Sequence, residues 1–140
     1  MPEADKLALV AAEWVAKAED DLKNAAHTLK LGRACPTDTV CFHVQQCVEK
    51  YLKAYLVWVN VPFRKTHEVE ALVSLMPGNA RPGMTVEEQA LLTSYAIGPR
   101  YPGWREVPLS EARRAVAIAR RLRKHFRSVL PKQALRGRIR

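Results

Sequence analysis

The chain has 140 residues, 48% of them hydrophobic and 26% charged, which fits one folded domain with its own core and excludes a disordered chain. No apolar run approaches the roughly 20 residues of a membrane span, and the amino terminus lacks a basic segment followed by an apolar one, so we expect a soluble cytoplasmic protein without membrane contact. The net charge of +9 is uneven, because residues 111–140 carry +10 and residues 1–110 carry −1.

Two long amphipathic helices are expected in the first half of the chain. Apolar residues at helical spacing from Leu7 to Leu29 predict a helix over about 4–31, which Gly32 ends. A second stripe predicts a helix over about 38–59, with Thr37 or Asp38 as its amino-terminal cap. The three cysteines are Cys35, Cys41 and Cys47. They have no C-x-x-C spacing, and their number is odd, so we expect free thiols rather than disulfides. We also predict no metal site and no cofactor.

Three further helices are expected, over about 66–76, 85–95 and 110–130. Thr66 is placed to cap the first of them, and Thr85 to Glu88 has the form of a capping box for the second. Prolines and glycines interrupt residues 98–104, which should form a turn or loop. No strand-like alternation occurs. The sequence therefore predicts an all-α fold, an antiparallel up-and-down bundle of four to five helices over residues 1–131, followed by a flexible basic tail over 132–140.

The second helix contains the stretch FHVQQCVEKYLKA, residues 42–54, which mixes polar and core-type side chains. At about 100° per residue, His43, Gln46, Lys50 and Lys53 fall within an arc of about 80° beside the apolar face. Such cations and donors suit a phosphate, and an amide could contact a base or sugar edge. The alternative is a solvated flank in which Glu49 pairs with Lys53.

Asp21 on the first helix presents a similar choice, because it borders the apolar stripe and should be partly covered in a bundle. It could pair with Lys17, four residues earlier in the chain. It could instead face the basic flank of the second helix and influence the charge state of the residues there.

The stretch FHVQQCVEKYLKA, followed by the triplet KTH at 65–67 and by RYPG at 100–103, resembles the HEPN family (higher eukaryotes and prokaryotes nucleotide-binding) from about Trp14 to Leu130. The resemblance implies a small helical bundle, commonly paired as a homodimer. Some members accompany a minimal nucleotidyltransferase in toxin-antitoxin pairs, one eukaryotic member binds nucleotides, and others are metal-independent ribonucleases. By this resemblance, the expected site for an ATP-like nucleotide consists of His43, Gln46, Lys50, Lys53, His67, Arg100 and Tyr101.

Several of these positions also have structural interpretations. Tyr101 could be a packed ring with its hydroxyl bonded, and Arg100 could be the partner of a carboxylate. Lys50 and Lys53 come from the second helix and Arg100 from the loop at 98–104, and we expect that these three cations could gather around one phosphate.

The ribonuclease members carry an Arg and a His separated by four to six residues, a spacing that Arg120 and His125 satisfy. In an unbroken helix these two lie about 140° and ~7.5 Å apart, so they would not converge within one subunit. We therefore favour nucleotide and partner binding, with ribonuclease activity on RNA as the alternative. A third possibility is passive RNA binding by the basic tail residues, which are Lys132, Arg136, Arg138 and Arg140.

Overall fold

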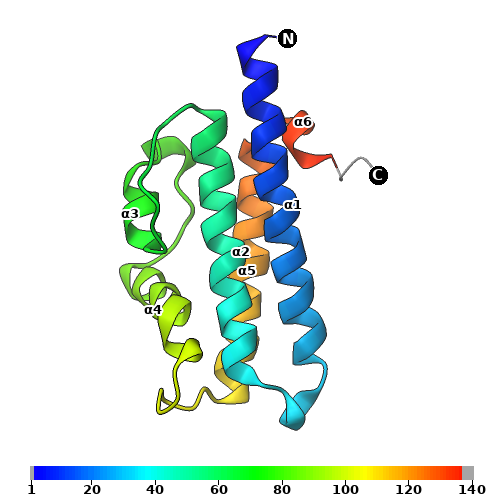
Figure 1. The fold of residues 1–140 in the computed structure, drawn as a ribbon, viewed down its shortest axis with the longest axis vertical. Coiled ribbons are helices and arrows are strands. Elements are labelled where there is room, and N and C mark those ends of the chain that lie inside the picture. The colour runs from blue at the N-terminus through cyan, green and yellow to red at the C-terminus, as the bar shows by residue number, and fades with distance from the viewer. Residues whose placement is uncertain (1, 137–140) are drawn as a thin grey trace.

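The structure is a computed structural model that describes residues 2–136, and within that range it contains helices and no β-strand (Figure 1). The α-helices are α1 (Glu3–Leu29), α2 (Thr37–Trp58), α3 (Val69–Ser74), α4 (Val86–Ile97), α5 (Leu109–Val129) and α6 (Lys132–Leu135). Three single-turn 3₁₀ helices are η1 (Gly32–Ala34), η2 (Gly78–Ala80) and η3 (Gly98–Arg100). The predicted all-α bundle is confirmed.

The helix α2 occupies the centre of the bundle and contacts α1, α3, α4 and α5. Figure 1 shows α1 antiparallel to α2 on one side, α3 and α4 on the other side, and α5 behind. Gly32, with a positive φ of 61°, turns the chain between α1 and α2. Because α2 is surrounded on most of its circumference, only one narrow face of it is left for contact with a ligand.

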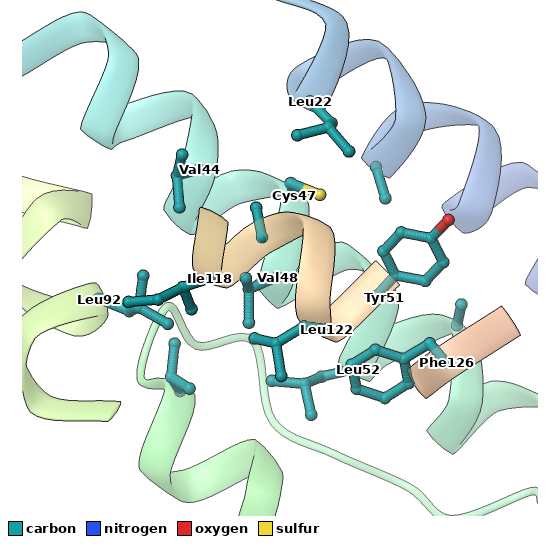
Figure 2. Close-up of a cluster of buried hydrophobic side chains, with 14 of the residues drawn as sticks. Leu22, Val44, Cys47, Val48, Tyr51, Leu52, Leu92, Ile118, Leu122 and Phe126 are labelled. Atoms are coloured by element: carbon teal, nitrogen blue, oxygen red, sulfur yellow. The ribbon is translucent and has the colours of Figure 1, made fainter. Parts of the chain in front are cut away.

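The core is built mainly from α2 and α5, with α1 and α4 closing it (Figure 2). Tyr51 stacks on Phe126 with their ring centroids 5.6 Å apart and their planes 8° apart. Cys41 and Cys47 are buried free thiols, and burial raises the pKa of Cys41 to about 12. At neutral pH these thiols are therefore protonated and contribute to packing.

The predicted caps had mixed outcomes. Thr85 forms the expected capping box with Glu88, in which each side chain bonds the backbone N–H of the other residue. The prediction for α2 was wrong, because its first helical residue is Thr37 and no side chain caps it. The Thr37 hydroxyl instead donates to the carbonyl of Val107 at 2.7 Å, and Asp38 accepts from the N–H of its neighbour Thr39.

The predicted cap of α3 was also wrong. The helix begins at Val69 rather than near Thr66, and the Thr66 hydroxyl oxygen accepts the Glu68 N–H at 3.1 Å. This hydrogen bond forms a local turn before the helix, which competes with capping. His67 consequently lies in the segment before α3 and not in its first turn.

The carboxy-terminal segment adds one more element to the bundle. Residues Lys132–Leu135 form α6, whose Ala134 is fully buried and which packs against α1. The bundle therefore extends past residue 131, where we expected a flexible tail to begin. Residues 137–140, including Arg138 and Arg140, lie outside the described residues. In residues 2–136, none of the helices has the length and apolar content required to cross a membrane.

Candidate functional site

The face of α2 that the other helices leave partly uncovered carries Phe42, His43, Gln46 and Lys50. It lies between α1 on one side and the segment that leads from Pro62 to α3 on the other (Figure 1). His43, Gln46 and Lys50 recur at intervals of three and four, and Phe42 precedes Gln46 by four, so the residues lie along one side of the helix. Helical spacing had predicted a polar face of His43, Gln46, Lys50 and Lys53, but Lys53 is buried.

Asp21 of α1 anchors two of these side chains. Its Oδ1 accepts a hydrogen bond from His43 Nδ1 at 2.8 Å, and its Oδ2 accepts one from Lys50 Nζ at 2.6 Å. The Asp21 side chain is only 10% exposed, whereas those of His43 and Lys50 are 28% and 22% exposed. Of the two alternatives for Asp21, the structure supports contact with the basic flank of α2. The carboxylate fixes the orientation of the imidazole.

A second carboxylate, Glu49, lies at the centre of a buried network next to this face. Its Oε1 accepts from Gln45 Nε2 at 3.0 Å and from His67 Nδ1 at 2.8 Å, and its Oε2 accepts from Lys53 Nζ at 2.9 Å. Burial raises the pKa of Glu49, but the hydrogen bonds from Gln45, Lys53 and His67 outweigh it and hold the pKa below its usual value of 4.5. Glu49 is therefore ionised at neutral pH.

The network continues to the surface through Gln46, whose Nε2 donates to Gln45 Oε1 at 2.6 Å. Gln45 also donates to the backbone carbonyl of His67 at 3.0 Å, which ties the segment before α3 to α2. Among the described residues, no buried side-chain nitrogen or oxygen atom lacks a hydrogen-bond partner. A fully satisfied buried network of this kind rigidifies its surroundings, so it holds the exposed side chains in place.

Sequence reasoning missed the roles of Gln45 and Glu49. The expected pair between Glu49 and Lys53 is present, but it is buried, with the residues 3% and 6% exposed. Lys53 Nζ also lies 5.5 Å from the ring centroid of Trp14 and 5.9 Å from that of Phe63. Lys53 is thus enclosed by a carboxylate and two aromatic rings. The i, i+4 spacing of Gln45 and Glu49 indicated that the two side chains could pair, but it did not indicate that they are buried.

Arg100 and Tyr101 lie near the other end of this face. The Arg100 guanidinium carbon is 5.2 Å from the ring centroid of Phe42, a cation–π contact. Phe42 and Lys53 are eleven positions apart, or about 16 Å along α2, so Arg100 and Lys53 do not gather around one phosphate. Tyr101 is 63% exposed and is therefore not the packed ring of the structural interpretation.

We call the set of His43, Gln46, Lys50, His67 and Arg100 the outer edge of α2. Both imidazoles use Nδ1 to bond a buried carboxylate, which leaves Nε2 for a ligand. The His67 side chain is 48% exposed and is the more accessible of the two. Cationic groups and neutral amide donors on one narrow face can bind a phosphorylated ligand. In residues 2–136, no three His, Cys, Asp or Glu side chains lie close enough to hold a metal ion.

The residues of the ribonuclease spacing lie elsewhere and on different faces of α5. His125 Nε2 donates to the carbonyl of Ala80 at 2.7 Å, and the imidazole is partly buried against the Phe126 ring. Arg120 is exposed and lines hollows between α1 and α5. One subunit therefore does not bring the two side chains together, in agreement with the 140° of rotation expected between them.

Comparison with known proteins gives one positive result. The sequence model of one protein family, described as the HEPN domain, matches residues 11–129. This range is most of the chain and includes α2, α3, α4 and all of α5. Searches of curated protein sequences and of solved structures returned no match.

Proposed function

Because the chain belongs to the HEPN family, we propose that it is a nucleotide-binding module and that the nucleotide contacts the outer edge of α2. The observation that carries this proposal is the pair of imidazoles, His43 and His67, each anchored through Nδ1 by a buried carboxylate. Gln46 follows His43 on α2 and is linked to the His67 backbone through Gln45, and Lys50 shares the Asp21 carboxylate with His43. Side chains held in this way lose little conformational freedom when a ligand binds.

Each residue of the edge has a defined part in this proposal. Lys50 would share its ammonium group between Asp21 and a phosphate oxygen, since an ammonium has three donors and the carboxylate uses one of them. Arg100, held over the Phe42 ring, would contact the other end of the ligand. Gln46 retains one amide hydrogen after its bond to Gln45, which suits a base or ribose edge.

Family membership also supports a wider proposal about partners. We propose that the chain forms a homodimer in the cytoplasm and acts with a minimal nucleotidyltransferase as one member of a toxin-antitoxin pair. Copurification from the native organism, followed by mass spectrometry, tests this directly. Recovery of a nucleotidyltransferase would support the pairing, and repeated recovery of the chain without one would count against it.

Thermal unfolding in the presence of nucleotides tests the binding proposal. A nucleotide at about ten times its dissociation constant should raise the melting temperature by about 3–6 °C. Lys50→Gln should remove most of this increase, because it deletes the cation beside His43. The matched control is Lys6→Gln, an exposed lysine near the start of α1. An equal loss in both variants, or no shift with any nucleotide in a millimolar panel, would contradict the proposal.

Ribonuclease activity remains the second candidate, because the exposed Arg120 and the spacing to His125 match the signature literally. Since one subunit keeps the two side chains apart, such activity would require a second copy of the chain to complete the site. It would appear as RNA cleavage that resists EDTA and is lost in His125→Ala. Cleavage that persists in that variant would exclude this site.

A further inference from the structure

The surface between α1 and α5 is a second region of concentrated charge, separate from the outer edge of α2. Two adjoining hollows lie there and share Arg120 as a lining residue. We call them together the α1–α5 groove. Six cationic side chains line it, namely Lys23, Lys30, Arg120, Arg123, Lys124 and Arg127. The groove therefore includes four of the eleven Lys and Arg side chains of residues 111–140.

Helical geometry places the cations of each helix on one side of that helix. On α5, Arg120, Lys124 and Arg127 fall within an arc of about 60°, and on α1 Lys23 and Lys30 fall within about 20° of each other. From Lys30 to Asp20 the groove follows α1 for about 15 Å, and from Arg120 to Ser128 it follows α5 for about 12 Å. Such a length accommodates several consecutive phosphates of an extended strand.

Carboxylates neutralise only part of this charge. Glu19 pairs with Arg123 at 2.9 Å and more distantly with Arg127 at 3.9 Å, and Asp20 lines the hollow on the α1 side. The remaining excess of cations creates a positive field along the groove. A polyanion with regularly spaced charges fits that field better than a single small anion does.

We propose that the α1–α5 groove binds the phosphate backbone of single-stranded RNA. A groove between two adjacent helices, whose axes are typically about 8–10 Å apart, suits one strand better than a duplex. Among the residues that line the two described hollows there is no Phe, Tyr or Trp, and His27 supplies the one ring, so recognition is mainly through phosphates and without sequence preference. A membrane surface fits less well, because interfacial helices insert apolar side chains and Leu22 and Ala26 are the only apolar residues among those lining the two described hollows.

This inference is independent of the nucleotide site and gives Arg120 a role in binding rather than in cleavage. The test measures binding of a fluorescent 12-nucleotide single-stranded RNA by anisotropy, at salt concentrations from 50 to 300 mM. Arg120→Gln/Lys124→Gln in the full chain should weaken binding about tenfold or more at low salt. It should also reduce the slope of log K against log salt by about 1.4, because each phosphate contact on a single strand contributes about 0.7.

The matched control is Lys6→Gln/Arg114→Gln, which removes the same charge from exposed positions of the same two helices but outside the groove. It should change affinity less than threefold and leave the salt slope intact.

The proposal is overturned if both double variants lose affinity equally, if the wild-type chain does not bind RNA at 50 mM salt, or if Arg138→Gln/Arg140→Gln alone abolishes binding. It is also overturned if phosphatidylserine vesicles are bound and RNA is not. A normal nucleotide-induced melting shift in the groove variant would show that the two sites are separate.

Discussion

At the scale of single residues, the environment of Glu49 determines how the candidate site is held. This carboxylate is buried, yet it stays ionised because Gln45, Lys53 and His67 all donate to it. The bond from His67 also joins α2 to the segment before α3. A neutral side chain at this position would leave the Lys53 ammonium buried without a carboxylate, which is among the more destabilising changes a protein core undergoes.

Glu49→Gln should therefore lower the free energy of unfolding at pH 7 by about 3 kcal/mol. The folded-state pKa of Glu49 lies below its ordinary value of 4.5, so its contribution is fully present above that pH and is lost as the pH falls through the folded-state value. Urea unfolding at pH 7 and pH 3 tests this. The difference between wild type and Glu49→Gln should shrink at pH 3, with exposed Glu13→Gln as the control. A difference that is the same at both pH values would show that the Glu49 charge is not what stabilises the fold.

At the scale of elements, the long helices follow from local periodicity, but their ends and connections do not. The stripe of α2 predicted its span to within one residue, because helical spacing is a local property. The hydroxyl of Thr37 finds its partner in Val107, seventy residues further along the chain, so no local pattern could show it. The burial of the Gln45 side chain likewise depends on the segment before α3, which covers this side chain only once the chain has folded.

The connection between α4 and α5 provides a test at this scale. Gly98 was expected only to interrupt a helix, but a Cβ at this position would lie 2.1 Å from the Trp104 ring, which packs edge-on against Tyr95. Gly98→Ala should displace the indole and cost about 1–3 kcal/mol of stability, with a changed tryptophan emission spectrum. Gly78→Ala is the matched control, because nothing lies within 4 Å of its Cβ position. Equal stability of the two variants would mean that the Trp104 packing contributes little.

At the scale of the whole molecule, the bundle presents two charged surfaces that share α1 as a common wall. The outer edge of α2 combines Asp21 of α1 with residues of three other segments, and the α1–α5 groove uses another face of α1. The sequence was sufficient to select His43, Gln46 and Lys50, because they share one helix. It could not show that Lys53 is enclosed or that Arg100 lies near Phe42, because both depend on how distant segments pack.

The four histidines allow one measurement to test the central claim, that a nucleotide contacts the outer edge of α2. His43 and His67 lie on that edge, His27 lines the α1–α5 groove, and His125 belongs to the ribonuclease spacing. NMR spectra of the imidazole groups, recorded during titration with ATP, report on all four at once. We predict that the signals of His43 and His67 move while those of His27 and His125 stay in place. Movement confined to His27 or His125, or no movement at millimolar ATP, would contradict the claim.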